Sequence, residues 1–371
     1  MMPLRVVLAG GGTAGHVNPL LATAHVLRER GHGVVVLGTE EGLESDLVPS
    51  QGFRLAVIPK VPMPRRPSLQ MFSVPGRLHE AVTRCMKVID DADVVVGYGG
   101  YVSAPAYIAA RKLGVPVVIH EQNVRAGWAN KMGARFAAAV ALTFPSTTLR
   151  AKSGRTEVTG MPLRTEIMEL ARVRQTDAGT RTARQEAARY FGMDPDLPTL
   201  LVTGGSLGAL RLNNAVIEVA PDLPPDIQIL HVTGKGKMAA VEKASSDPAV
   251  SVPWFVHEYI TEMDQAMACA DLVVCRSGAG TVSELTAIGM PALYVPFPIG
   301  NGEQALNAAD QVRAGGALLV YDQDFGGATL KETVLPLLRN PDRLMAMGKA
   351  SRSVSPGDGG ENLVKMIEMA A

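Results

Sequence analysis

The chain has 371 residues, and its 36 Lys and Arg balance 36 Asp and Glu, so the formal net charge is zero. A neutral chain lacks the overall basic field that attracts nucleic acid, and 47% apolar with 19% charged residues excludes disorder as the main state. At ~100–200 residues per domain, the length predicts two domains. The three cysteines form no CxxC pair, the N-terminus shows no secretory signal and no apolar run approaches ~18 residues. We therefore expect a reducing cytosol and only peripheral membrane contact.

The first half of the chain alternates short valine-rich runs with amphipathic stretches, which is the pattern of a parallel sheet covered by helices. A strand from Leu4 to Ala9 ends in a glycine-rich turn. A helix from Pro19 to Arg30 follows and ends at Gly31, a favourable C-terminal cap. Further strands are predicted at Gly33–Leu37, Val94–Val96, Val115–Ile119 and Ala139–Thr143.

The pattern restarts after the polar, arginine-rich stretch from Thr165 to Ala188. Glycine and proline in Gly160-Met161-Pro162 interrupt both periodicities, so the domains are placed at 1–163 and 164–351. The end of the chain is apolar on one face and needs a docking surface, so a helix at 352–371 is expected to pack back on the first domain. Strands of the second domain are predicted at Thr199–Thr203, Ile227–Val232, Ser251–Phe255, Asp271–Cys275, Ala292–Val295 and Ala317–Val320.

The first strand ends in Gly10-Gly11-Gly12-Thr13-Ala14-Gly15-His16, which matches the dinucleotide-binding spacing GxGxxG. Such a turn aims backbone N–H groups and the positive end of a helix dipole at an anion, so it predicts a phosphate site. Glu40 after the second strand keeps an NAD-dependent oxidoreductase open, and a tight turn built only for packing is a third interpretation. His16 is a candidate base beside the anion, or a histidine bonded to backbone.

Two turns in the second half repeat this arrangement. Gly204-Gly205-Ser206-Leu207-Gly208 lacks the Lys-Ser/Thr ending of a P-loop, which disfavours nucleoside-triphosphate hydrolysis. The run from Cys275 to Glu284, CRSGAGTVSE, opens another helix, and two helix N-termini at one sheet edge suit a diphosphate. Glu284 is a candidate partner for sugar hydroxyls, or simply a favourable partner of the helix dipole.

Two further loops of the first half, Gly97 to Ser103 (GYGGYVS) and His120 to Asn123 (HEQN), follow strands at the edge where open α/β sheets bind ligands. Hydrogen bonding that only satisfies the loop is the alternative for His120 and Asn123. The Asp-x-Asp pairs precede strands or form turns, and no HxxxH or HExxH occurs, so no metal site is predicted.

The segment from Pro62 to Lys87 mixes apolar residues, including Met71 and Phe72, with five basic residues, namely Arg65, Arg66, Arg77, Arg84 and Lys87. Apolar side chains flanked by cations suit the surface of an anionic bilayer. An ordinary amphipathic helix packed on its sheet explains the same pattern.

Taken together, the runs Gly10 to His16, Gly97 to Ser103, His120 to Asn123 and Cys275 to Glu284 resemble one family over nearly the whole chain. It is the family of UDP-N-acetylglucosamine:N-acetylmuramyl-(pentapeptide) pyrophosphoryl-undecaprenol N-acetylglucosamine transferases. The resemblance implies an inverting, metal-independent glycosyltransferase of the GT-B type, with two Rossmann-like, doubly wound parallel-sheet α/β domains facing across a cleft. It implies transfer of N-acetylglucosamine to the muramyl C4 hydroxyl of lipid I, giving β-1,4-linked lipid II and UDP in peptidoglycan synthesis, without a cofactor.

The resemblance also assigns residues, with the sugar nucleotide on the second domain and lipid I on the first. His16 would be the catalytic base or would orient the acceptor diphosphate. Ile260 would face the uracil, Glu284 the ribose and Gln304 the sugar hydroxyls. The donor set is Thr13, Ala14, Gly15, Asn123, Arg164, Ser206, Ile260, Ala279, Gly280, Thr281, Val282, Ser283, Glu284 and Gln304. The acceptor set is Gly11, Gly12, Tyr98, Gly99, Gly100, Tyr101 and Ser103.

Three positions depart from the family pattern. Ala14 stands where a glycine is common, and Met161 replaces the asparagine of the usual Gly-Asn-Pro. The run Gly300 to Glu303 replaces a more charged stretch before Gln304, which bears on sugar contacts and not on the reaction class.

The family resemblance implies a peripheral protein on the cytoplasmic side of the cell membrane, at the inner leaflet, with other cell-wall synthesis proteins as partners and no nucleic acid. Three alternatives stay open at this stage. They are a nicotinamide or flavin oxidoreductase, a non-catalytic nucleotide-sugar-binding module, and a transferase acting on natural products or glycolipids. Transfer from UDP-N-acetylglucosamine to a lipid I analogue separates all three from the implied activity.

Overall fold

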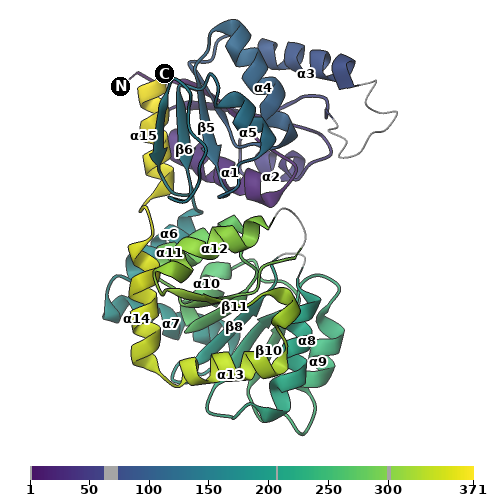
Figure 1. The fold of residues 1–371 in the computed structure, drawn as a ribbon, viewed down its shortest axis with the longest axis vertical. Coiled ribbons are helices and arrows are strands. Elements are labelled where there is room, and N and C mark those ends of the chain that lie inside the picture. The colour runs from purple at the N-terminus through teal and green to yellow at the C-terminus, as the bar shows by residue number, and fades with distance from the viewer. Residues whose placement is uncertain (1, 62–73, 206–207, 299–301) are drawn as a thin grey trace. The chain divides into compact units, whose positions relative to one another are not determined.

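The computed structural model describes residues 2–61, 74–205, 208–298 and 302–371 (Figure 1). The chain divides into two compact units. Unit 1 comprises Met1–Arg164 and Pro356–Ala371, and unit 2 comprises Thr165–Ser355. Each unit is built on one parallel sheet with helices between successive strands, so each has the Rossmann-like, doubly wound α/β fold.

The sheet of unit 1 has seven parallel strands in the order β3-β2-β1-β4-β5-β6-β7. The strand order reverses between β1 and β4, and ligands of doubly wound sheets bind at the carboxyl ends of strands beside such a reversal. The strands are β1 (Arg5–Ala9), β2 (Gly33–Gly38), β3 (Arg54–Val57), β4 (Val94–Gly97), β5 (Val117–Glu121), β6 (Ala139–Leu142) and β7 (Arg155–Val158).

The two faces of this sheet bury separate cores because successive side chains of a strand point to opposite faces. Val6 and Leu8 of β1 belong to one core, whereas Val7 and Ala9 belong to the other. The first core packs on α1 and α15, and the second packs on α3, α4 and α5. The helices of unit 1 are α1 (Ala14–Glu29), α2 (Glu44–Ser50), α3 (Val74–Ile89), α4 (Gly100–Leu113), α5 (Trp128–Gly133) and α15 (Gly359–Ala370).

Two of these helices differ from the predicted bounds. α1 begins at Ala14 instead of Pro19, because the glycine-rich turn already supplies its first turn. The expected helix at 352–371 is interrupted at Pro356 and Gly357, and α15 begins only at Gly359. α15 lies beside α1 (Figure 1), where Arg30 pairs with Glu368 at 2.8 Å and also with Glu361.

The sheet of unit 2 has six parallel strands in the order β10-β9-β8-β11-β12-β13. The stretch Thr165 to Ala188, which the sequence shows only as polar and arginine-rich, forms two helices, α6 (Thr165–Val173) and most of α7 (Asp177–Phe191). Its strands are β8 (Thr199–Thr203), β9 (Gln228–Val232), β10 (Trp254–His257), β11 (Leu272–Cys275), β12 (Ala292–Tyr294) and β13 (Ala317–Leu319). The later helices are α8 (Leu210–Val219), α9 (Met238–Ser245), α10 (Met263–Cys269), α11 (Ala279–Ile288), α12 (Glu303–Arg313), α13 (Gly327–Leu338) and α14 (Pro341–Ser353).

Across the described parts of both units, no helix combines the length and the apolar character that a bilayer crossing requires.

Candidate functional site

The glycine-rich turn of unit 1 joins β1 to α1. Gly12 has φ +89°, a left-handed conformation that favours glycine, and a Cβ there would lie 2.7 Å from a ring carbon of Tyr101. Thr13, Ala14 and Gly15 are exposed. The first N–H groups of a helix have no acceptor within the helix, and no acidic residue occupies the first turn of α1. This turn therefore presents positive partial charge to an anion.

His16 lies in the first turn of α1 and is half-buried. Its Nδ1 lies 2.8 Å from Thr13 Oγ1. The backbone of Gly99 and Gly100 runs against the imidazole, since a Cβ at Gly99 would lie 3.5 Å from Nε2. Burial lowers the pKa of His16, and the negative charge of Glu44 offsets part of that shift. The imidazole is thus neutral near pH 7, the form that accepts a proton.

The loop after β4 supports this turn from its neighbouring strand. Ser103 Oγ lies 2.8 Å from the carbonyl oxygens of both Ala9 and Gly99, which ties the end of β1 to the start of α4. Tyr98 and Ser103 are fully buried, so their side chains belong to the core under the loop. Tyr101 is half-buried and lies over Gly12. Of the predicted acceptor set, Gly12, Gly100 and Tyr101 are half-buried and lie nearest the surface, whereas Gly11 and Gly99 are buried.

The HEQN loop after β5 is organised by Glu121, a role that the sequence interpretation missed. The Glu121 carboxylate accepts hydrogen bonds from the N–H groups of Asn123 at 3.0 Å and Gly127 at 3.1 Å, and from Asn130 Nδ2 at 2.9 Å. His120 is buried, its Nε2 lies 3.2 Å from the Gly160 carbonyl oxygen, and burial lowers its pKa to about 4. These contacts agree with the alternative interpretation of His120, in which its hydrogen bond only satisfies a neighbouring loop.

A second acidic residue that the sequence interpretation missed is Glu44, at the start of α2. Its carboxylate is buried and accepts a hydrogen bond from the Gly12 N–H at 2.9 Å. Glu40, the acidic residue that the sequence singled out, is exposed after β2. No local sequence signal distinguishes Glu44 from its acidic neighbours, because its role depends on the pairing of β1 with β2.

In unit 2, the turn after β8 is shaped by glycines. Gly205 has φ +78° and Gly208 has φ +66°, and a Cβ at Gly208 would overlap the Thr233 carbonyl oxygen. The Gly208 N–H donates to the Gly205 carbonyl oxygen at 2.8 Å. Ser206, predicted to contact the donor, lies outside the described residues.

The turn after β11 leads into α11. Arg276 anchors the neighbouring segment after β12, donating to the Val295 carbonyl oxygen at 2.9 Å and pairing with Asp322 at 2.5 Å. The first turn of α11, Ala279 to Thr281, is half-exposed, as is Glu284, whereas the Val282 side chain is buried. β11 pairs with β8, so the two turns emerge side by side at one sheet edge.

The remaining donor residues lie around this edge or belong to unit 1. Gln304, near the start of α12, accepts a hydrogen bond from the Phe297 N–H at 2.9 Å. Ile260, buried, follows β10, which is separated from β8 by β9. Thr13 to Gly15, Asn123 and Arg164 belong to unit 1. The predicted donor set is therefore divided between the two units.

Comparisons with known proteins identify both units. The glycosyltransferase family 28 N-terminal domain matches residues 6–142, and the family 28 C-terminal domain matches residues 199–362. The chain is 48% identical over 370 residues to the UDP-N-acetylglucosamine--N-acetylmuramyl-(pentapeptide) pyrophosphoryl-undecaprenol N-acetylglucosamine transferase of Streptomyces coelicolor, covering 98% of this chain and 97% of the relative. It is 49% identical over 369 residues to the protein of the same name from Nocardioides, with the same coverage.

Among solved structures, MurG of Acinetobacter baumannii matches with a TM-score of 0.79 and 29% identity, over 99% of this chain and 100% of that one. A UDP-GlcNAc 2-epimerase from Neisseria meningitidis matches with a TM-score of 0.67 at 15% identity, over 99% and 100%, and that likeness concerns the fold alone. The chain therefore belongs to glycosyltransferase family 28 and, within it, to the UDP-N-acetylglucosamine–N-acetylmuramyl-(pentapeptide) pyrophosphoryl-undecaprenol N-acetylglucosamine transferases.

Proposed function

We propose that this protein transfers N-acetylglucosamine from UDP-N-acetylglucosamine to the muramyl C4 hydroxyl of lipid I, forming β-1,4-linked lipid II and UDP. The observation that carries this proposal is the full-length identity of 48–49% to transferases of that name. Glycine-rich turns at the carboxyl edge of the sheet in each unit support it, because donor and acceptor both contain a diphosphate. Family membership replaces the oxidoreductase interpretation of the first turn.

Unit 2 is proposed to hold the donor. The half-exposed first turn of α11, together with Ser206, would receive the diphosphate, whose charge grows as the bond to the sugar breaks. Arg164, at the end of the first segment of unit 1, is proposed to join the donor set as a second source of positive charge. Ile260 would contact the uracil and Glu284 the ribose. Gln304, whose side-chain oxygen accepts a hydrogen bond from the Phe297 N–H after β12, would bind sugar hydroxyls. Thr13, Ala14, Gly15, Asn123, Gly280, Thr281, Val282 and Ser283 complete the proposed donor set.

Unit 1 is proposed to hold lipid I. The exposed start of α1, whose first N–H groups have no acceptor within the helix, would receive the acceptor diphosphate, and the left-handed glycines Gly12 and Gly100 lie half-buried near it. Tyr101 belongs to the same surface, and the buried residues Gly11, Tyr98, Gly99 and Ser103 support it from beneath. His16 lies beside Gly99 and Gly100.

The chemistry requires one proton transfer. The C4 hydroxyl oxygen attacks the anomeric carbon from the face opposite UDP, so a C–O bond forms as the bond to the β-phosphate oxygen breaks and the configuration inverts. Neutral His16 would take the hydroxyl proton, and a lowered pKa keeps it neutral for that task. Orientation of the acceptor diphosphate is the second proposed role of the same residue.

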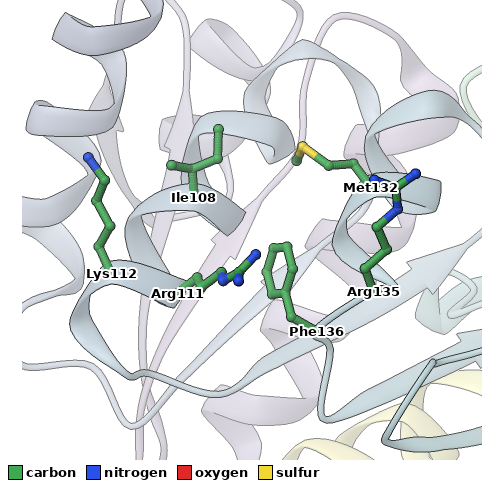
Figure 2. A pocket seen from close by; sticks show the side chains of 6 residues that line it. All are labelled: Ile108, Arg111, Lys112, Met132, Arg135 and Phe136. Atoms are coloured by element: carbon green, nitrogen blue, oxygen red, sulfur yellow. The ribbon is translucent and has the colours of Figure 1, made fainter.

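The polyprenyl chain of lipid I is membrane-bound, so we propose that unit 1 meets the inner leaflet from the cytoplasmic side. α3 exposes Arg77, Arg84 and Lys87. Met71 and Phe72 of the predicted membrane segment lie outside the described residues. A surface hollow of about 410 Å³ on the same unit mixes apolar and basic side chains (Figure 2). It is lined by Ile108, Arg111, Lys112, Met132, Arg135 and Phe136.

Such a mixture suits an anionic bilayer, since the apolar groups enter the interface while the cations meet headgroups. The Arg111 guanidinium lies 5.1 Å from the Phe136 ring centroid, so the cation and the aromatic ring are neighbours in this hollow (Figure 2). Reversal of charge at Arg111 and Arg135 should weaken sedimentation with phosphatidylglycerol vesicles. Lys349→Glu, an exposed site on unit 2, is the matched control. If charge reversal at Arg111 or Arg135 weakens vesicle binding no more than Lys349→Glu does, the hollow is not a membrane contact.

The decisive experiment offers the purified chain radiolabelled UDP-N-acetylglucosamine and three acceptors. These are a lipid I analogue, a natural-product aglycone and water alone. We expect label to pass only to the lipid I analogue. Transfer to the aglycone, or donor binding with no transfer to any acceptor, would overturn the proposal while leaving the fold intact.

A further inference from the structure

Glu44 occupies a pocket built by glycines around its side chain. It is fully buried, with no accessible surface. A Cβ added at Gly11, Gly38 or Gly42 would overlap the Glu44 side chain. Only residues without side chains at these positions leave room for a carboxylate under the glycine-rich turn.

Hydrogen bonds occupy both oxygens of this carboxylate. Oε2 accepts from the Gly12 N–H at 2.9 Å, and Oε1 accepts from the Thr39 N–H at 3.0 Å and the Thr39 hydroxyl at 2.9 Å. The Thr39 hydroxyl donates its only hydrogen to Glu44. The Tyr101 hydroxyl, whose oxygen lies 3.2 Å from Thr39 Oγ1, must therefore donate to the Thr39 oxygen. A chain of bonds therefore runs from Tyr101 through Thr39 to Glu44 and on to Gly12.

We propose that Glu44 is a positioning residue, which holds Gly12 and Tyr101 in the arrangement that presents the start of α1 and His16 to the acceptor. This inference rests on the proposed function of unit 1. A buried carboxylate is expensive unless well paired, and Glu44 is well paired because each of its oxygens accepts at least one hydrogen bond. A neutral amide has only one accepting oxygen, so it cannot join Gly12 and Thr39 in the same way.

The negative charge of Glu44 also acts on His16. The groups that face His16 are Thr13 at the start of its own helix, the backbone of Gly99 and Gly100 at the start of α4, and Glu44 from α2. Glu44 raises the pKa of His16 against the larger effect of burial. Lys60 lies near the same group of residues, with its ammonium 5.6 Å from the Tyr101 ring centroid and 3.1 Å from Glu41. Glu41 raises the pKa of Lys60 most, and the negative charge of Glu44 adds to this shift.

Three variants test the inference. Glu44→Gln keeps the shape and one oxygen for Thr39, but it loses the charge and points an amide N–H at the Gly12 N–H. Glu44→Asp keeps the charge on a shorter side chain. Glu218→Gln is the control, because the Glu218 carboxylate accepts from the Gly327 N–H at 3.0 Å at the start of α13, in unit 2.

Two readouts are needed. The first is the pKa of His16 in the free protein, from NMR titration of histidine Cε1–H signals, assigned by the signal missing in His16→Gln. The second is kcat and KM for transfer to the lipid I analogue as a function of pH. Thermal unfolding of each variant corrects activity for any loss of folded protein.

For Glu44→Gln we expect a lower His16 pKa, an acid limb of kcat/KM moved to lower pH, and a fall of kcat by about tenfold or more, equivalent to about 1.4 kcal/mol of activation free energy. KM for UDP-N-acetylglucosamine should change less than about threefold. Glu44→Asp should keep the His16 pKa close to that of the parent, and Glu218→Gln should change neither readout.

An unchanged His16 pKa with an activity loss matched by lost folded protein would reduce Glu44 to a structural residue and overturn the inference. If Glu44→Gln does not fold, a parental His16 pKa in Glu44→Asp supports the inference, and a lowered one overturns it. Absence of transfer by the parent protein would instead refute the proposed function, and the NMR titration would still test the effect of Glu44 on His16.

Discussion

Thr13 Oγ1 and His16 Nδ1 lie 2.8 Å apart in the first turn of α1. If His16 is to accept a proton at Nε2, the Nδ1 position must carry the hydrogen and donate it to the Thr13 oxygen. The threonine oxygen can accept that hydrogen, which leaves Nε2, the nitrogen beside Gly99, as the basic one. One hydroxyl couples the glycine-rich turn to the proposed proton acceptor.

The first prediction concerns His16→Ala. Loss of the base should lower kcat by about 100-fold or more, the usual contribution of general base catalysis, while the affinity for UDP changes little. Steady-state kinetics and calorimetric titration with UDP measure the two effects. His25→Ala, on the same helix and partnered by Gln51, is the control that should retain turnover. Equal losses in turnover and UDP affinity would reassign His16 to donor binding.

The second prediction concerns the stability of each unit at acidic pH. Burial lowers the pKa of His120 in unit 1 to about 4 and that of His231 in unit 2 to about 3. Both are neutral in the fold and take up a proton on unfolding below ~6.5, so stability falls as the pH drops from ~6.5 toward the folded pKa values. The loss is on the order of 1 kcal/mol per pH unit for each histidine.

Urea unfolding at pH 7 and pH 5 measures this loss. In His231→Phe the ring still stacks on Trp254, whereas the bond to Asn213 is lost. This variant should be less stable than the parent at pH 7 but lose less stability on acidification. An unchanged pH dependence of its unfolding free energy would show that His231 is not the titrating group.

The central strands were predictable because a sheet covered on both faces needs continuous apolar runs, as in β1 and β8. The edge strands β3 and β7 were not predicted. Arg54, Arg155 and Glu157 face solvent there and break the apolar run. The helices α6 and α7 were missed because only one narrow side of each is buried among polar residues.

The site was predictable where a short run of sequence determines it, as in the glycine turns that directly follow strands. Glu44 was not, because it meets Gly12 from 32 residues away and only the adjacency of β1 and β2 brings them together. The burial of Tyr98 and Ser103 was equally unpredictable, because the GYGGYVS run alone does not determine which side chains point into the core. Tertiary contacts decide both.

The third prediction concerns Glu284, one turn into α11. Glu284→Ala should weaken UDP-N-acetylglucosamine binding by about tenfold, because a carboxylate paired with ribose hydroxyls makes charge-assisted hydrogen bonds. Glu242→Ala removes an exposed carboxylate from α9 in the same unit and should leave donor affinity unchanged. Fluorescence or calorimetric titration measures both. Donor affinity equal to the parent in Glu284→Ala would remove this residue from the ribose site.

The fourth prediction separates the conformation of Gly12 from its surroundings. Gly12 and Gly31 have similar positive φ angles, +89° and +83°, so alanine at either position should cost about 1 kcal/mol of folding free energy. At Gly31 no atom lies within 4 Å of the new Cβ, whereas at Gly12 the Tyr101 ring is 2.7 Å away. Gly12→Ala should therefore displace Tyr101 and lower transfer at least tenfold at unchanged UDP affinity, while Gly31→Ala keeps its activity. Equal activities in the two variants would mean that the Gly12–Tyr101 contact does not shape the acceptor surface.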